Sequence, residues 1–134
     1  VELWRSDGTA RGTALLLDIA PGASTSMPRS LTAFGERVVF AAGDAAGREP
    51  WISDGTSAGT RRLADIAPGA ADSSPRSFLP AERLLYFAAF DGTSRSAGLY
   101  VTDGSSANVQ LLGRFEASFP GFPLEPVTVG ERLF

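Results

Sequence analysis

The hydrophobic positions of this chain fall in short runs separated by Gly, Asp, Pro and Ser. No window has a 3.6-residue apolar period long enough for a helix, whereas runs rich in β-branched and aromatic residues between turn signals are typical of strands. In the middle of the chain we expect strands at residues 30–34, 37–42, 49–53 and 60–66. The pattern therefore predicts an all-β fold built from four-stranded antiparallel meanders.

The same 47-residue unit occurs almost three times. Of residues 1–47, 23 are identical to the residue 47 positions further on. The segment at residues 2–9 returns at residues 49–56, and a more divergent third copy, displaced by a further 49 positions, lies at residues 98–105. A period in the forties made of short strands indicates a β-propeller, in which each repeat forms one four-stranded blade.

The repeat boundaries predict one β-propeller unit with three blade equivalents. We expect a half blade at residues 1–19, complete blades at 30–66 and 77–115, and a second half blade at 126–134. The start supplies strands three and four of a blade, and the end supplies strands one and two. Because propellers typically have four to eight blades, we expect self-association into a six-bladed ring, or neighbouring blades in a longer parent chain.

Composition narrows the function classes. The chain has no Cys and no His, which excludes disulfides, thiol or imidazole catalysis and ordinary zinc or copper sites. Twelve basic residues, all Arg, against fifteen carboxylates leave a net charge of -3, so we expect no nucleic-acid partner. The longest apolar run, residues 84–90, is too short to span a membrane, and we expect no membrane insertion. The acidic surface favours an extracellular or cell-surface location.

A family resemblance rests on residues 2–13, which read Glu-Leu-Trp-x-Ser-Asp-Gly-Thr-x-x-Gly-Thr, and on the following segment 16–22. This string resembles the ELWxxDGT repeat of large bacterial proteins that are mostly exported or surface-associated. The third copy departs from it, with Tyr100 in place of Trp and Ser105 in place of Thr. The resemblance implies a secreted or surface repeat propeller for display, adhesion or binding, and it implies no enzymatic reaction.

The Asp-Gly-Thr motif predicts a structural turn. An Asx side chain accepts a hydrogen bond from the backbone two residues on, and the following Gly takes a positive φ. We therefore assign the motif a structural role, similar to that of the Asp box of sialidase-like propellers. The residues concerned are Asp7, Gly8, Asp54, Gly55, Asp103 and Gly104.

Two further sets of residues recur at the repeat spacing. Trp4, Trp51 and Tyr100 share one position, and we expect their rings to pack in the core rather than to form a platform for sugars. Asp18 and Asp65 recur with Arg29 and Arg76 on the segments between blades, and we expect a local ion pair to hold each of these connectors.

Strand order predicts where a ligand would bind. Connectors between blades and the loops from strand two to strand three should emerge on one face, and the Asp-Gly-Thr hairpins on the other. Residues that differ between copies would give the connector face its specificity. These candidate binding residues are Asp44, Arg48, Asp72, Asp91, Arg95, Phe119 and Phe122.

The leading hypothesis is a non-enzymatic extracellular module that binds a protein or glycan, or takes part in structural assembly, without a cofactor. One alternative is a glycan-binding or sialidase-like glycoside hydrolase propeller, which would require a Tyr or carboxylate nucleophile. The two tyrosines, Tyr86 and Tyr100, lie in apolar segments, which disfavours this reading. The other alternative is a calcium-stabilised adhesion module using Asp44 and residues 91–93, which lack the dense acidic spacing of a calcium loop.

Overall fold

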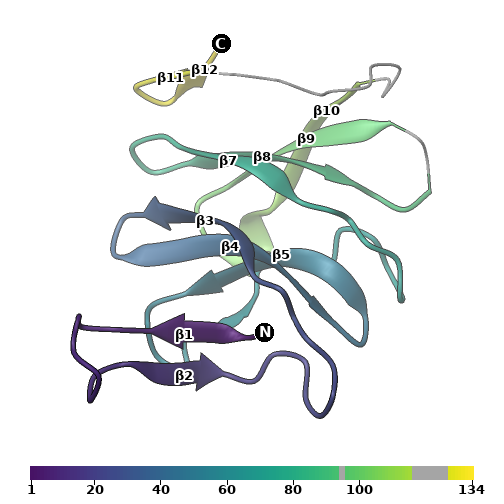
Figure 1. Ribbon diagram of the computed structural model, residues 1–134. Helices are drawn as coiled ribbons and strands as arrows, with labels where there is room; N and C mark the ends of the chain where they lie inside the picture. The colour runs from purple at the N-terminus through teal and green to yellow at the C-terminus, as the bar shows by residue number, and fades with distance from the viewer. Residues whose placement is uncertain (94–95, 116–126) are drawn as a thin grey trace.

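The strands form four antiparallel sheets in chain order (Figure 1). The computed structural model describes residues 1–93, 96–115 and 127–134. The N-terminal hairpin, called the N-hairpin here, joins β1 (Leu3–Arg5) to β2 (Ala14–Leu17). The C-terminal hairpin, called the C-hairpin, joins β11 (Thr128–Val129) to β12 (Arg132–Leu133). Between them lie two four-stranded sheets.

Sheet 1 and sheet 2 have the same meander topology. Sheet 1 runs in the order β3 (Arg29–Phe34), β4 (Arg37–Asp44), β5 (Gly47–Ser53) and β6 (Arg61–Arg62). Sheet 2 runs in the order β7 (Arg76–Pro80), β8 (Leu85–Phe90), β9 (Ala97–Thr102) and β10 (Gln110–Phe115). In the described part of the chain, helical structure is limited to a short 3-10 turn at Ser106–Asn108. The prediction of an all-β chain with antiparallel sheets is confirmed.

The fourth strand of sheet 1 is much shorter than the sequence pattern predicts. A strand was expected over residues 60–66, but β6 spans Arg61–Arg62, and one further backbone bond joins Leu63 N to the Pro50 carbonyl at 2.7 Å. The chain then leaves the sheet because the backbone N–H groups of Ile66 and Ala67 donate to the side chain of Glu49. A side-chain carboxylate thus replaces the ladder partner that a longer strand would need.

The sheets pack face to face, and their side chains fill two core layers. Strand β4 serves both layers because successive side chains of a strand point to opposite faces. Phe40 and Ala42 pack with Trp51 in the layer shared with the N-hairpin, whereas Val39 and Ala41 pack in the layer between sheets 1 and 2. This double burial explains why the run from Val38 to Ala42 is apolar throughout.

The two hairpins lie at opposite ends of the stack, with the N-terminus at one end and the C-terminus at the other (Figure 1). In the described residues, β1 pairs only with β2 and β12 only with β11. Across the same residues, no helix has the length and apolar content needed to cross a membrane.

Candidate binding face

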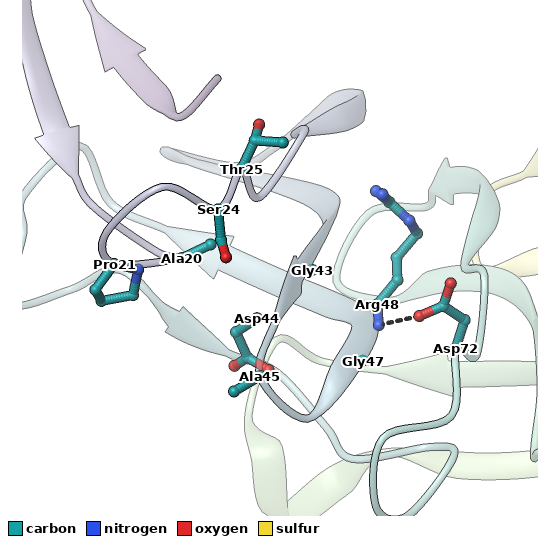
Figure 2. Close-up of a pocket in the computed structure, with 10 residues that line it drawn as sticks. All are labelled: Ala20, Pro21, Ser24, Thr25, Gly43, Asp44, Ala45, Gly47, Arg48 and Asp72. Carbon is teal, nitrogen blue, oxygen red and sulfur yellow. Dashed lines mark hydrogen bonds between the residues drawn. The ribbon is translucent and has the colours of Figure 1, made fainter.

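Three segments converge at one edge of the stack around a hollow of about 390 Å³ (Figure 2). They are the connector between the N-hairpin and sheet 1, the β4–β5 turn, and the connector between sheets 1 and 2. We call this edge the connector face. The residues that line the hollow are Ala20, Pro21, Ser24, Thr25, Gly43, Asp44, Ala45, Gly47, Arg48 and Asp72.

Arg48 and Asp72, two of the predicted binding residues, lie side by side in this hollow. The backbone N–H of Arg48 donates to Oδ1 of Asp72 at 2.7 Å (Figure 2). The guanidinium of Arg48 donates to the carbonyl of Met27 at 3.0 Å, so Arg48 bridges the two connectors. Asp72 is exposed and is one of the residues that line the hollow.

Asp44 also lines the hollow, but its carboxylate is engaged in local structure. Its Oδ1 accepts the N–H of Ala46 at 2.8 Å, and both its oxygens accept from Arg62 at 2.7 and 2.6 Å. Burial lowers the pKa of Arg62, but the hydrogen bonds and charge of Asp44 outweigh it and raise the pKa above its ordinary value. Asp44 therefore locks the β4–β5 turn against β6.

Asp91 occupies the position in sheet 2 that Asp44 has in sheet 1, and it does not line the hollow. Its Oδ1 accepts the N–H of Thr93 at 3.0 Å, and its other oxygen forms an ion pair with Arg114. The structure thus brings Asp44, Arg48 and Asp72 together and places Asp91 in a separate turn. Arg95, Phe119 and Phe122 lie outside the described residues.

The connector between sheets 1 and 2 approaches the β4–β5 turn closely because Gly47 has no side chain. Its φ is 92°, and a Cβ atom at this position would collide with the carbonyl oxygen of Ala71. The turn therefore requires Gly for its backbone angle as well as for space. Chemically, the hollow offers the side chains of Ser24, Thr25 and Asp72 on a framework held by backbone hydrogen bonds, an arrangement suited to binding a polar group.

The Asp-Gly-Thr hairpins lie at β1–β2, β5–β6 and β9–β10, and all three contain the Asx turn. The N–H of the residue two positions on donates to Oδ1 of Asp7, Asp54 and Asp103 at 2.9, 2.8 and 2.7 Å. The Gly that follows each Asp has a φ of 85° to 90°. Hydrogen bonds from the turn residues lower the pKa of all three carboxyls below the ordinary value of 3.8.

A second glycine makes room for each aspartate in the first two copies. A Cβ atom on Gly12 or Gly59 would overlap the carboxylate of Asp7 or Asp54. In the third copy the equivalent residue is Asn108, whose amide donates to Oδ2 of Asp103 at 2.7 Å. In the third copy, the side chain of Asn108 therefore holds the turn aspartate by a hydrogen bond that the first two copies do not have.

A second hollow, larger than the one at the connector face, lies near these hairpins. It has a volume of about 700 Å³ and mixes acidic and basic side chains. Nearby, Arg37 reaches from sheet 1 to the Asp103 and Gly104 carbonyls of sheet 2, both at 3.4 Å. The residues that line this second hollow are Phe34, Gly35, Glu36, Arg37, Asp54, Glu82, Arg83 and Asp103. Sequence reasoning assigned this face a structural role and did not find the hollow.

Within the described residues, no three carboxylates gather closely enough to hold a metal ion. The carboxylates of Asp44 and Asp91, which the calcium alternative would use, instead accept hydrogen bonds from backbone N–H groups and from arginine.

The recurrent aromatic position is buried in two copies and exposed in the first. Trp51 and Tyr100 are 8% and 7% exposed, and Tyr100 stacks on Phe87 with ring centres 5.4 Å apart. Trp4 is 59% exposed, so the prediction that it packs in the core is wrong. The ring of Trp51 lies in the layer shared with the N-hairpin, and Trp4 has no such preceding layer beside it in the described chain.

The connectors are held by a glutamate and a serine that sequence reasoning did not single out. Glu49 is fully buried and accepts from Ile66 N at 2.9 Å and from Ser73 Oγ at 2.8 Å. Glu2 accepts from Ile19 N at 3.0 Å and from Ser26 Oγ at 2.5 Å. We call each pair a Glu–Ser clamp.

The clamp replaces the predicted Asp–Arg pairs, and that prediction is wrong. Asp65 pairs with Arg62, and in the described residues no ion pair joins Asp18 to Arg29 or Asp65 to Arg76. The guanidinium of Arg76 instead lies 4.9 Å from the ring centre of Phe90. A buried carboxylate that faces free backbone N–H groups competes better than an exposed ion pair.

A signal for the clamp was present in the sequence. Glu2 and Glu49, like Ser26 and Ser73, are identical at the repeat spacing, and the third copy has Gly98 in place of the glutamate. The connector pattern is lost in the same copy. Loss of the glutamate together with the connector would have indicated that one holds the other.

The two clamps differ in their electrostatics. Burial raises the pKa of Glu49 above its ordinary value of 4.5, although hydrogen bonds from Ile66 and Ser73 oppose the shift. Burial would also raise the pKa of Glu2, but hydrogen bonds from Ser26 and Ile19 outweigh it and lower the pKa below 4.5. The difference follows from the deeper desolvation of Glu49.

Comparison with known proteins adds no family assignment: no protein-family model, no curated protein and no solved structure matches the chain.

Proposed function

We propose that this chain is a non-enzymatic binding module of β-propeller type, located outside the cell or at its surface, whose connector face binds a glycan or a protein. The observation that carries the proposal is the hollow at the connector face. There, two connectors and the β4–β5 turn present Ser24, Thr25 and Asp72 around a space of about 390 Å³. This volume lies in the range of small ligand sites, and a sugar residue is an occupant of suitable size and polarity.

The propeller part of the proposal is supported by the 47-residue period and by the sheets themselves. Each complete repeat forms a four-stranded antiparallel sheet, and successive sheets pack face to face in chain order. These are the properties of propeller blades. The likeness to ELWxxDGT repeats supports the same architecture and the extracellular or surface location.

Two features favour binding over catalysis of the sialidase type. The hydroxyl of Tyr86 donates to the carbonyl of Glu131 at 2.7 Å, and this side chain is buried. Burial and the charge of Asp91 raise the pKa of Tyr100, which keeps its hydroxyl protonated. Neither tyrosine is thus placed or charged as an exposed nucleophile would be.

The test is an NMR titration of the ¹⁵N-labelled chain with a panel of soluble neutral and acidic oligosaccharides. We expect chemical-shift changes at Ser24, Thr25, Arg48 and Asp72. Asp72→Asn keeps an acceptor for the Arg48 N–H but removes the charge, and it should weaken binding. Glu82→Gln makes the same charge change at the opposite hollow and should leave binding unchanged.

Chemical-shift changes confined to the residues of the second hollow, around Glu82, would place the binding site near the Asp-Gly-Thr hairpins and contradict the proposal. Absence of shifts with every oligosaccharide would contradict glycan binding at the connector face. Release of sugar from a fluorogenic sialoside by the purified chain would contradict the non-enzymatic assignment.

A further inference from the structure

We propose that the N-hairpin of one copy of this chain docks on the C-hairpin of a second copy, so that β11, β12, β1 and β2 form one four-stranded sheet. This inference concerns the two ends of the stack (Figure 1) and does not depend on what the connector face binds. It makes the protein an assembly unit as well as a binding module.

The unpaired strand edges are complementary in type. By the repeat, β12 corresponds to β4, and β1 corresponds to β5. Strands β4 and β5 are paired neighbours in sheet 1, whereas β12 and β1 each have one open edge in the described residues. An open edge is a template for a further strand. Because Val38 lies opposite Ser53 in sheet 1, the repeat places Leu133 opposite Ser6 of the second copy.

The exposed apolar side chains at the two ends are also complementary. Tyr100 and Leu63 belong to one core layer between sheets 1 and 2, and Leu63 is fully buried. The repeat relates Tyr100 to Trp4 and Leu63 to Leu112, which are 59% and 53% exposed. Docking would place Trp4 of one copy against Leu112 of the other, as the chain already packs their equivalents.

The C-hairpin carries a second exposed apolar face that the same docking covers. Phe134 and Val129 are 69% and 63% exposed, whereas their repeat equivalents, Val39 and Phe34, are 0% and 5% exposed. Val39 and Phe34 lie in the layer between sheets 1 and 2. In the docked pair, Phe134 and Val129 would face sheet 1 of the second copy.

The occupant must present the opposite end, and a second copy of this chain does so. If two N-hairpins met each other, β1 of one copy would pair with β1 of the other. Neither complete sheet contains a pairing of that kind, since β5 pairs with β4 and β6, and β9 with β8 and β10. The contact is therefore head-to-tail, and each copy uses two different surfaces. Two such contacts can close a symmetric pair.

Sedimentation of the full chain from nanomolar to high micromolar concentration tests the inference. We expect a species of twice the 14.0 kDa chain mass, or a larger closed multiple. Trp4→Arg or Leu112→Arg should each weaken association by roughly thirtyfold or more, the effect of losing a buried interface anchor. The control is Ala58→Arg in the β5–β6 hairpin, since Ala58 and its repeat equivalents, Arg11 and Ala107, are all exposed, and it should associate as the original chain does.

Mixing the two end variants gives the sharpest result. Neither should associate alone, but an equimolar mixture should form a one-to-one pair, because Trp4→Arg retains an intact C-hairpin end and Leu112→Arg retains an intact N-hairpin end. Unchanged circular dichroism of each variant at low concentration would show that folding is intact. A mixture that stays monomeric, or a chain that is monomeric throughout the range, overturns the inference.

Register is tested by cross-linking, since the chain has no Cys of its own. A ¹⁵N-labelled Ser6→Cys chain mixed with an unlabelled Leu133→Cys chain should form the mixed disulfide in preference to either homodimer. Replacing Leu133→Cys by Arg132→Cys, which moves the thiol to the opposite face of the strand, should lower the yield. Equal yields for both registers, or a preference for homodimers, would overturn the docking geometry.

Discussion

The first and second copies of the repeat have the same local hydrogen bonds but different burial. Ser6 and Thr13 join their hydroxyls at 2.6 Å, and Ser53 and Thr60 do so at 2.7 Å. The first pair is exposed, whereas the second is 0% and 6% exposed. The hairpin geometry is therefore set by residues within the hairpin, and its burial is set by the sheet that packs beside it.

The aromatic position shows the same difference more strongly. Trp51 is covered by the N-hairpin, and Trp4 faces solvent. The indole N–H of Trp51 is buried and has no hydrogen-bond partner in the described residues, so its ring contributes through packing alone. This explains why Tyr100 can take the same position in the third copy.

The largest expected effect comes from removing these two rings. Trp51→Ala should lower the free energy of unfolding by about 3 to 5 kcal/mol, because it removes a large buried ring and leaves a cavity in the core layer. Trp4→Ala should change it by no more than about 0.5 kcal/mol, because the ring is exposed. Urea unfolding at low protein concentration measures both. Equal losses for the two variants would show that Trp4 is buried in solution.

Removing the two clamps should give the next largest difference. Glu49→Ala leaves the N–H groups of Ile66 and Ala67 without their acceptor at a buried site, and the Ser73 hydroxyl keeps only the Arg48 carbonyl, so we expect a loss of about 3 kcal/mol. Glu2 is only half-buried, so water can take the place of its carboxylate in Glu2→Ala, and the loss should be at most about 1 kcal/mol. Urea unfolding is again the measurement, and a loss at Glu2 as large as that at Glu49 would contradict the role of burial.

The turns should respond equally in both copies, which sharpens the comparison. Gly12→Ala and Gly59→Ala each push a Cβ atom into the carboxylate of the turn aspartate, and each should cost about 1 to 2 kcal/mol. Gly113→Ala in β10 is the control, since a Cβ atom there meets nothing within 4 Å. A clear difference in thermal stability between the Gly12 and Gly59 variants would show that the turn depends on its tertiary surroundings.

The smallest effect is a pH dependence of opposite sign in the two clamps. The raised pKa of Glu49 means that its contribution is present below pH 4.5 and is lost as the pH rises through its folded value. The lowered pKa of Glu2 means that its contribution is present above pH 4.5 and is lost as the pH falls through its folded value.

The check is urea unfolding of Glu2→Gln and Glu49→Gln against the original chain between about pH 3 and pH 7. The stability deficit of Glu2→Gln should grow with pH, and that of Glu49→Gln should shrink. Parallel changes in the two variants would rule out different folded-state pKa values for Glu2 and Glu49.

Much of the secondary structure was predictable because it depends on local chemistry. The Asp-Gly-Thr turns are specified by an Asx side chain and a Gly with positive φ, and these residues lie within two positions of each other. The alternation of strands and turns likewise follows from residues close in sequence. The end of β6 was not predictable in this way, because Glu49, distant in the chain, takes the N–H groups of Ile66 and Ala67.

The candidate site was predictable in part. Strand order placed Asp44, Arg48 and Asp72 on one face, and all three line the hollow. The sequence could not show that Asp44 forms an ion pair with Arg62, or that the guanidinium of Arg48 donates to the carbonyl of Met27. Both contacts join segments about twenty residues apart, and their geometry depends on the packing of complete sheets.

The sequence by itself determined the repeat, the all-β class and the turn chemistry, since identical local residues make identical local hydrogen bonds. Only the tertiary structure decided which copy of each residue is buried. Trp4 and Trp51, or Glu2 and Glu49, are the same residues in the same local geometry, and they differ because burial depends on the layer alongside, which a repeat motif does not encode.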